Sequence, residues 1–598
     1  MAEIHTIIAP LSGTIESLKS KSGIEVAAGD SVLVLESMKV HVQVKSDVSG
    51  RVSELLVNEG DTVQRGEPLL KIEQNLVTSE AYVEQESVPQ QKNEHPANAQ
   101  FHQRQAMALD SHRQAAQQKR HAKGYRTARE NLNDLCDLTS FQEYGQFAVA
   151  AQRGKRDYEA LKSETAADGI ITGIGNVNAE LFGDKPSRTA LIINDYSVLA
   201  GTQGYFHHQK LDRILAIAGK QNLPVVMFTE GGGGRPNDTD VTTVNSGLQC
   251  TSFSTWAGMA EGENQVPRIA VANGYNFAGN AALFGAADIT IATKNSWIGM
   301  AGPAMIEGGG LGSVKPTDIG SIDVQSQNGV VDIVANDEQH ACQLAKQALS
   351  FLQGTVDDWQ AHDQNLLSTA MPENRKEIYD IRGIIELIAD QQSVLELKSE
   401  FGASIVTTLI RIEGQAIGVM ASNCGVLGGA IDTNAGEKAS EFIDLCHRFN
   451  LPIVSLCDTP GFMIGPAHEE LGAVRRLAKF FTVGARHTAP FIAVVLRKCY
   501  GLGAQAMLGG HTARPSYTLS WPTGEFGPMG LEGAVNLGFR KELDAEKSAE
   551  KRAALFDKLV SEQYRRGQAI EVASTLEVDA VIDPIETRAT LARCLQDC

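Results

Sequence analysis

The stretch KQNLPVVMFTEGGGG, residues 220–234, decides how most of this chain folds. Its apolar run VVMF is bounded by Asn-Leu-Pro on one side and by glycines on the other, as a buried strand is. The residues before it, KLDRILAIAGK (210–220), repeat apolar side chains at helical spacing. Helix, strand and glycine-rich loop in this order predict a layered α/β architecture with mostly parallel strands. Ligands are then expected at the carboxyl ends of the strands, where such loops emerge.

The same order of residues returns 228 positions later. The following segments and glycines correspond: Asn222 to Pro224 with Asn450 to Pro452, Gly233 with Gly461, and, after a slip of a few residues, VPRIAV (266–271) with APFIAV (489–494) and Gly279 with Gly503. We therefore predict two homologous α/β domains, residues 105–355 and 356–598.

The glycine-rich loops of both halves are candidate catalytic elements. Glycine at a strand-to-helix junction lets backbone N–H groups point at one spot, and a helix N-terminus adds partial positive charge, so each half can hold one oxyanion. Packing alone or a phosphate cradle would produce a similar loop. A Walker loop is excluded because GGGGRP lacks the following Gly-Lys-Ser/Thr, and no dinucleotide-binding fingerprint is present. The candidate donors are Gly231, Gly232, Gly233, Gly234 and Gly279 in the first half, and Gly461, Gly465 and Gly503 in the second.

The N-terminal residues 1–73 contain a second duplication, with an offset of 37. SGTIESLKSKSGIEVAAGDSVLVLE from Ser12 falls on SGRVSELLVNEGDTVQRGEPLLKIE from Ser49. Two such halves pack into a flattened two-sheet β sandwich. In VLESMKVHV (34–42), Lys39 stands where the first half passes to the second, and a hairpin tip at that point would expose its amine. The alternative is an ordinary surface lysine.

Residues 74–104 are polar and contain prolines, and they show no sustained period. Such a composition cannot bury enough apolar area to order itself, so we predict a flexible linker.

Composition excludes several classes of protein. The 598 residues carry 53 basic and 72 acidic side chains, a net charge of −19, which disfavours binding to nucleic acid or anionic membranes. Nine cysteines without a CxxC pair indicate reduced thiols, and no metal site is predicted. The N-terminus lacks a signal-peptide pattern and no apolar run reaches membrane-spanning length, so a cytoplasmic location is expected.

The hairpin sequence Glu36-Ser-Met-Lys39 resembles the attachment motif of biotinyl/lipoyl carrier domains, in the form that carries biotin. The resemblance implies covalent biotin on Lys39, flanked by Met38. Val40 departs from the second methionine that is common in the motif, which leaves lipoate as an alternative.

Three stretches resemble crotonase-like carboxyltransferases: KGYRTARENLNDLCDLTSFQEYG (123–145), CDTPGF (457–462) and WPTGEFGPMGLEGAV (521–535). The match runs from Lys123 to the C-terminus and is closest to the β-type carboxyltransferase of single-chain, broad-substrate acyl-CoA carboxylases. It implies transfer of CO2 from carboxybiotin on the chain's own carrier domain to the α-carbon of an acyl-CoA, with acetyl-CoA or propionyl-CoA as expected substrate. The first half would bind acyl-CoA and the second carboxybiotin.

The resemblance also implies partners. The chain contains no ATP-grasp segment, so a separate biotin carboxylase subunit and a biotin protein ligase are expected, with a homo-oligomer, at least a dimer and expected to be a hexamer. Two other readings stay open: a biotin-dependent acyl-CoA decarboxylase or transcarboxylase, and a lipoyl-type carrier fused to a non-catalytic crotonase-like scaffold.

Several polar residues near the loops are assigned smaller roles. We expect His207, His208, His468 and Glu469 to be partly exposed contacts of the substrate or of an interface rather than general bases. Lys210, Arg235 and Arg153 are candidates for binding the CoA phosphates.

Overall fold

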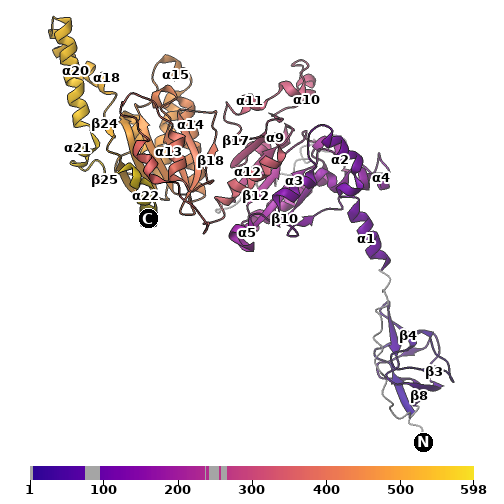
Figure 1. Ribbon diagram of the computed structural model, residues 1–598. Helices are drawn as coiled ribbons and strands as arrows, with labels where there is room; N and C mark the ends of the chain where they lie inside the picture. Colours follow the sequence, from indigo (N-terminus) through magenta and orange to yellow (C-terminus); the bar gives the residue numbers. More distant parts are fainter. Residues whose placement is uncertain (1–3, 75–94, 236–237, 242–254, 257–265, 598) are drawn as a thin grey trace. The chain divides into compact units, whose positions relative to one another are not determined.

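The computed structural model describes residues 4–74, 95–235, 238–241, 255–256 and 266–597. The chain forms two compact units, Met1–Glu94 and His95–Cys598 (Figure 1). In the described part of the chain, no helix has the length and apolarity needed to cross a membrane.

The first unit is the predicted β sandwich. Its two four-stranded sheets have the orders β1-β8-β6-β3 and β5-β4-β2-β7. Alternating apolar side chains such as Leu33, Leu35 and Ile72 are completely buried between the sheets. The strands are β1 (Ile4–Ile8), β2 (Gly13–Leu18), β3 (Glu25–Val26), β4 (Ser31–Ser37), β5 (Val40–Lys45), β6 (Gly50–Leu55), β7 (Thr62–Val63) and β8 (Pro68–Gln74).

The predicted linker is only partly described. Residues 75–94 lie outside the described residues. Helix α1 occupies Pro96–Ala106, so the end of the segment 74–104 is helical, and α2 follows at Gln114–His121. His95 caps α1 by accepting a hydrogen bond from the Ala97 N–H at 3.1 Å.

The first half of the large unit contains a seven-stranded sheet of order β17-β15-β13-β12-β11-β10-β9. From β11 to β17 neighbouring strands are parallel, as predicted, while β9 and β10 are antiparallel. Helix α7 (Tyr205–Gln221) packs on one face and α12 (Glu338–Ser350) on the other. The strands are β9 (Gln142–Tyr144), β10 (Ile170–Asn176), β11 (Arg188–Asn194), β12 (Val225–Phe228), β13 (Arg268–Ala272), β15 (Ile289–Thr293) and β17 (Ile333–Ala335).

The second half repeats this layout in a sheet of order β18-β19-β20-β21-β22-β23-β25, with β24 beside β22. Helix α14 (Thr433–Arg448) packs on one face and α13 (Ile381–Ile388) on the other. The strands are β18 (Leu395–Leu397), β19 (Ile405–Ile412), β20 (Gln415–Ser422), β21 (Ile453–Thr459), β22 (Phe491–Tyr500), β23 (Tyr517–Ser520), β24 (Glu525–Gly527) and β25 (Ala580–Val581).

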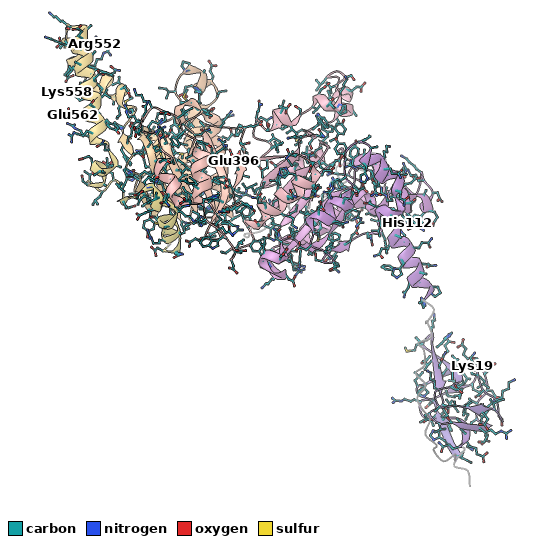
Figure 2. All side chains as sticks on the ribbon, in the orientation of Figure 1. Lys19, His112, Glu396, Arg552, Lys558 and Glu562 are labelled. Carbon is teal, nitrogen blue, oxygen red and sulfur yellow. The ribbon has the colours of Figure 1, made fainter. Side chains whose placement is uncertain are left out.

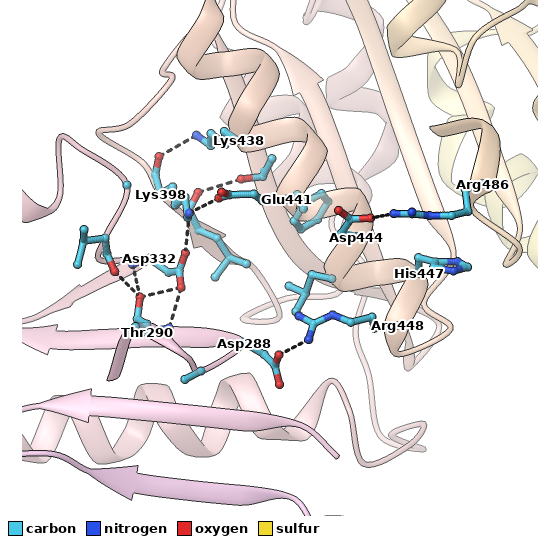
Figure 3. A pocket seen from close by; sticks show the side chains of 18 residues that line it. Asp288, Thr290, Asp332, Lys398, Lys438, Glu441, Asp444, His447, Arg448 and Arg486 are labelled. Carbon is cyan, nitrogen blue, oxygen red and sulfur yellow. Dashed lines mark hydrogen bonds and ion pairs between the residues drawn. The ribbon is translucent and has the colours of Figure 1, made fainter. Parts of the chain in front are cut away.

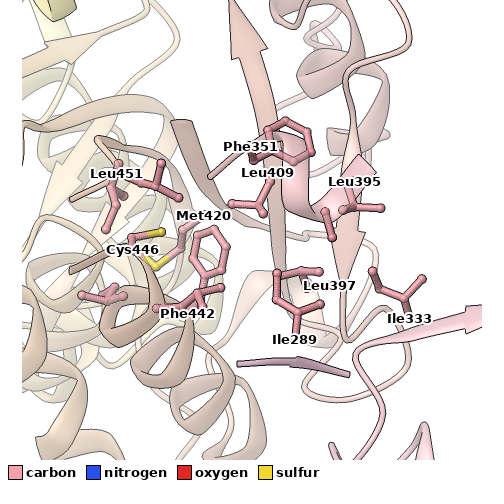
Figure 4. Packing of buried hydrophobic residues seen from close by; sticks show 14 of the residues in the cluster. Ile289, Ile333, Phe351, Leu395, Leu397, Leu409, Met420, Phe442, Cys446 and Leu451 are labelled. Carbon is pink, nitrogen blue, oxygen red and sulfur yellow. The ribbon is translucent and has the colours of Figure 1, made fainter. Parts of the chain in front are cut away.

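One hydrophobic cluster runs through both halves. Ile289 and Ile333 of the first sheet belong to the same buried cluster as Leu397, Leu409 and Phe442 of the second half (Figure 4). Because this apolar surface is shared, the halves form a single compact unit.

A charged helix, α20 (Ala549–Arg566), lies near the C-terminus. Arg552, Lys558 and Glu562 project along it (Figure 2), and none of its residues is buried. Half-buried Leu555 and Leu559 give it one apolar side, as expected for a surface helix that packs against the rest of the unit with one face.

Candidate active site

The carrier hairpin places Lys39 as the sequence predicted. Strands β4 and β5 pair up to Ser37 and Val40, which leaves Met38 and Lys39 as a two-residue turn. Both turn residues have positive φ, 50° and 67°, as tight hairpin turns with right-handed strand twist require. Met38 is 95% exposed and Lys39 is exposed, and no hydrogen bond or ion pair holds the Lys39 amine within residues 4–74. The amine is therefore open to acylation.

Two of the four glycines in the first loop are not free to bind an anion. The Gly231 N–H donates to the Tyr275 carbonyl at 2.7 Å, and the Gly232 N–H donates to the Ala200 carbonyl at 3.2 Å. These bonds anchor the start of the loop. The sequence could not separate these glycines from Gly233 and Gly234, because the acceptors lie in distant segments.

The end of this loop leaves N–H groups without acceptors. Gln203 bonds to both neighbours of Gly234, accepting from the Arg235 N–H at 2.8 Å and donating to the Gly233 carbonyl at 3.1 Å. In such a parallel bridge the N–H of Gly234 points away from Gln203. Gly233 packs against Ala278 and Gly279, where α9 (Gly279–Gly285) begins. Among the described residues, no acceptor faces the N–H groups of Gly233, Gly234 and Gly279.

The second half repeats this arrangement. Ile431 bonds to both neighbours of Phe462, donating to the Gly461 carbonyl at 3.0 Å and accepting from the Met463 N–H at 2.8 Å. The Gly461 N–H itself donates to the Thr459 hydroxyl at 3.1 Å. A Cβ on Gly503 would lie 2.9 Å from the Phe462 nitrogen, so these two residues adjoin. In the part of the chain that is described, neither N–H has an acceptor.

The donors predicted from the sequence did not include Phe462, whose N–H is a candidate donor, and they included Gly461, whose N–H is already bonded to Thr459. Glycine-rich loops draw attention to glycine, yet any residue except proline carries an N–H. The 228-residue offset pairs Phe462 with Gly234 and would have found it. Gly465 has φ of 119° and starts α15 (Pro466–Glu470), and a Cβ there would meet only open space. It is not brought against Gly503.

A buried amide network holds the first loop in place. Asn280 is completely buried, and its Nδ2 donates to the carbonyls of Gly201 at 3.1 Å and Gly232 at 2.6 Å. Its Oδ1 accepts from Asn194 Nδ2 at 3.0 Å and Gln203 Nε2 at 2.7 Å. One side chain thus connects three loops at the carboxyl ends of the strands.

The histidines of the first half are buried, contrary to the expectation of partial exposure. His207 has no exposed surface and His208 has 5%, and burial lowers the pKa of both, that of His207 well below its usual value. They are core residues of α7. His468 is half-buried and Glu469 is exposed.

Two of the three predicted phosphate-binding cations are also structural. Lys210 Nζ is buried and donates to the carbonyls of Ala167, at 2.9 Å, and Ile170. Its counterpart in the second half, Lys438, donates to the Lys398 and Ile405 carbonyls at 2.7 and 2.8 Å. Burial lowers the pKa of Lys210 to about 8 and that of Lys438 to about 7. Arg235 pairs with buried Asp168 at 2.6 Å.

Arg153, by contrast, is exposed, and its guanidinium lies 4.1 Å from the centre of the Tyr158 ring. It remains a candidate for a CoA phosphate.

A cavity of about 470 Å³ borders the first loop. Ala200 and Tyr275, whose carbonyls accept from that loop, belong to its wall together with Tyr125 and Tyr196. The other lining residues are Ala116, Lys119, Arg120, Lys123, Ser197 and Glu230, of which Lys119 and Lys123 are exposed. The cavity therefore has aromatic walls and a basic rim.

A cavity of about 880 Å³ lies at the junction of the two halves (Figure 3). Two ion pairs cross the junction, Arg448 with Asp288 at 2.5 Å and Lys398 with Asp332 at 3.7 Å, and Lys398 also pairs with Glu441 of its own half at 2.5 Å. Asp288 and Asp332 directly precede β15 and β17, so this cavity lies at the amino ends of the strands. It is a joint between halves, away from the glycine loops.

An exposed hairpin lysine lies on one unit, and on the other lie two equivalent clusters of backbone amides for which the described residues provide no acceptor. Residues 119–597 match the carboxyl transferase domain family, and residues 5–72 match the family of biotin-requiring enzymes. The chain belongs to the carboxyl transferase family, its large unit has the crotonase-like fold, and its cofactor is biotin.

Three relatives place it further. A single-chain, multi-domain long-chain acyl-CoA carboxylase of known structure is 45% identical, with a TM-score of 0.80; the match covers 99% of this chain and 56% of that one. The transcarboxylase 12S crystal structure, described as a hexamer, is 29% identical over 84% of this chain and 94% of its own, with a TM-score of 0.71. The methylmalonyl-CoA carboxyltransferase 12S subunit of Propionibacterium freudenreichii subsp. shermanii is 30% identical over 80% of this chain and 90% of its own.

Proposed function

We propose that this chain transfers a carboxyl group from biotin on its own carrier domain to the α-carbon of an acyl-CoA, acetyl-CoA or propionyl-CoA, as one component of an acyl-CoA carboxylase. The observation that carries the proposal is the pair of equivalent amide clusters, Gly233, Gly234 and Gly279 in one half and Phe462 and Gly503 in the other. Carboxyl transfer to a thioester develops negative charge on two oxygens, and each cluster matches one of them.

The first cluster is assigned to the thioester oxygen. When the α-proton leaves an acyl-CoA, charge moves onto that oxygen as an enolate forms. The N–H groups of Gly234 and Gly279 are already oriented and lack other acceptors among the described residues, so they stabilise this charge without reorganising. The partial positive charge at the start of α9 adds to the effect.

The second cluster is assigned to the ureido oxygen of biotin. Biotin bound on Lys39 would supply the nitrogen that carries the carboxyl group and that could take up the α-proton after transfer, so no side-chain base would be needed. The amides of Phe462 and Gly503 would hold the ureido oxygen as it gains charge.

The chain offers a fitting attachment point and a fitting CoA pocket. Lys39 is exposed on a tight turn and has no partner among residues 4–74. The 470 Å³ cavity beside Gly231 has tyrosine walls for an adenine ring, and Lys119 and Lys123 at its rim for phosphates. These lysines replace Lys210 and Arg235 as candidates.

Partners follow from the same chemistry. Biotin must be attached by a biotin protein ligase and carboxylated by a separate biotin carboxylase subunit. The hexamer described for transcarboxylase 12S supports a homo-hexamer of this chain. A cytoplasmic location is part of the same proposal.

The deciding experiment replaces Lys39 by arginine, which keeps the charge and removes the acylation site. Intact mass should show biotin on the wild-type chain and none on Lys39→Arg, and ATP-dependent bicarbonate fixation with a biotin carboxylase should disappear. Exposed Lys45 on β5 is the matched control, because Lys45→Arg should keep both. A Lys39→Arg chain that still fixes bicarbonate through its own cofactor would refute the carrier assignment.

The same assay separates the alternatives. The name of the 12S relative favours a transcarboxylase as second candidate, in which carboxyl groups move between two acyl-CoA substrates without ATP. A chain that fixes no bicarbonate with ATP but still exchanges carboxyl groups between acyl-CoA substrates would be a transcarboxylase. A lipoyl mass on Lys39 would select the non-catalytic scaffold.

A further inference from the structure

Each amide cluster is preceded by a buried carboxylate. Glu230 comes directly before Gly231, and Asp458 comes directly before the Thr459–Gly461 turn. The 228-residue offset pairs these two acids, and they are only 2% and 0% exposed. A buried carboxylate requires an ionic or hydrogen-bonded partner. Both halves provide one.

In the first half the partner comes from the segment before the first sheet. Arg120, on α2, donates through Nη1 and Nη2 to the two oxygens of Glu230, at 2.8 and 2.7 Å. Its Nε donates to the Arg126 carbonyl at 3.0 Å, and its guanidinium lies 4.9 Å from the centre of the Tyr125 ring. Every part of the guanidinium is thereby held, and the bidentate pair fixes Glu230 in direction as well as in distance.

In the second half the partner comes from the neighbouring strand. Arg497, on β22, donates through Nη2 to Asp458 Oδ2 at 2.9 Å and through Nη1 to the Glu377 carbonyl at 2.7 Å. In the register that pairs Gly279 with Gly503, Arg497 corresponds to Asn273, whose Nδ2 lies 3.3 Å from Glu230 Oε2. The first half thus has the side-chain amide of Asn273 where the second half has the guanidinium of Arg497. The positive charge in the first half comes instead from Arg120 on α2.

We propose that the two pairs, Glu230–Arg120 and Asp458–Arg497, position the amide clusters for the reaction. Helix α2 then contributes to the acyl-CoA half by holding Glu230 through Arg120. This rests on the proposed function. Gly231 and Gly461, with φ of 152° and 122°, lie one and three residues after the acids, so a fixed acid side chain helps to hold the strained backbone with which each loop begins. Arg120 also lines the 470 Å³ cavity, so it acts from the wall of the proposed CoA pocket.

The Glu230–Arg120 pair is expected to make the reaction depend on pH. Burial raises the pKa of Glu230 to about 7, with Glu338 and Asp195 raising it further and Arg120 opposing them. Tyr125, Tyr196 and Asn273 are its other polar neighbours. As pH falls through 7 the carboxyl takes up a proton, the ion pair with Arg120 is lost, and the loop loosens.

The test is carboxyl transfer from malonyl-CoA to free biotin by the full chain, the reverse of the proposed reaction. Glu230→Gln and Asp458→Asn remove charge with little change of shape. Each should lower kcat about 100-fold and change KM for malonyl-CoA and biotin less than about threefold, because displacement of a positioned group by about 1 Å costs about that much. The wild-type kcat should rise with pH through 7; Glu230→Gln should abolish this rise and Asp458→Asn should keep it.

Matched controls separate positioning from folding. Arg129 and Glu143 form another bidentate, mostly buried pair, at 2.7 and 3.0 Å, remote from the glycine loops. Glu143→Gln should cost stability and leave kcat within about threefold. If Glu230→Gln fails to fold, Arg120→Lys serves in its place, since it keeps the charge but loses the bidentate bond and should lower kcat about tenfold.

Unchanged kcat in both acid variants, a loss seen only in KM, or an equal loss in Glu143→Gln would each overturn the proposal. Failure of the proposed function would look different, because the wild-type chain itself would then transfer no carboxyl group.

Discussion

The two halves of the large unit use the same backbone device but hold it with different side chains. In each half a residue bonds to both neighbours of a central donor, Gln203 around Gly234 and Ile431 around Phe462. The first loop is fixed by the buried Asn280 network, whereas the second has apolar Phe462 and an 82% exposed Ile464. Because an amide donor requires a backbone position and no particular side chain, the loops diverge in sequence without losing their geometry.

The largest expected effect comes from adding one methyl group to each cluster. A Cβ on Gly503 would lie 2.7 Å from the Cα and carbonyl carbon of Gly461, so the backbone of the loop must move. We expect Gly503→Ala to lower kcat for transfer from malonyl-CoA to biotin by about 100- to 1,000-fold, as for loss of an oxyanion donor. A Cβ on Gly279 would overlap only the side-chain oxygen of Gln203, and Gly279→Ala should cost about tenfold.

Gly285→Ala is the control for both variants. Gly285 ends the same helix as Gly279, and a Cβ there meets nothing within 4 Å. Its kcat should stay within about twofold of wild type. Equal losses of kcat in Gly279→Ala and Gly503→Ala would show that the two loops tolerate an added methyl group equally. That result would contradict the difference between the halves.

A second test removes the side chain that only the first half uses. Asn280→Ala leaves the carbonyls of Gly201 and Gly232 without their buried donor, so the free energy of unfolding should fall by about 3 kcal/mol. Chemical denaturation followed by circular dichroism measures this, and Asn365→Ala on the surface should change it by less than about 0.5 kcal/mol. An Asn280→Ala protein as stable as wild type would mean that the first loop, like the second, keeps its conformation without this side chain.

The smallest expected effect is a pH dependence of stability in the second half. Burial lowers the pKa of His487 to about 4, with His447 and Arg514 adding to the shift. Between pH 6.5 and 4 the unfolded chain binds a proton here and the folded chain does not, so stability falls as pH falls through that window. His487→Phe should reduce this acid loss by about 1–2 kcal/mol.

Exposed His511 provides the matched control for that measurement, because His511→Phe makes the same substitution at the surface and leaves His487 in place. A slope unaffected by His487→Phe would show that the histidine is not buried as a neutral ring in solution.

The architecture was predictable because it depends on local patterns. Alternating apolar residues predicted the sandwich and its hairpin at Lys39, and helix, strand and glycine in order predicted the parallel sheets. Both duplications are visible by aligning the chain with itself. The alignment also contained Phe462, opposite Gly234, although attention to glycine alone overlooked it.

The choice among donors was not predictable in the same way. Gly231 and Gly232 differ from Gly233 and Gly234 only in whether a carbonyl from Tyr275 or Ala200 reaches them, and those residues are tens of positions away. The burial of Lys210, Arg235 and His207 is equally non-local, because each is enclosed by segments that meet only in the folded chain.

By itself, the sequence determined the two duplicated layouts, the exposed lysine between two strands and the positions of the flexible glycines, since each follows from the spacing of apolar residues and from turn chemistry. Only the tertiary structure decided which amides are left without acceptors and which cations are buried with partners in the core. It also decided that Arg120 pairs with Glu230, whereas Arg497 pairs with Asp458. The reason is physical: a hydrogen bond or ion pair depends on distances of about 3 Å between atoms whose separation along the chain carries no information about their separation in space.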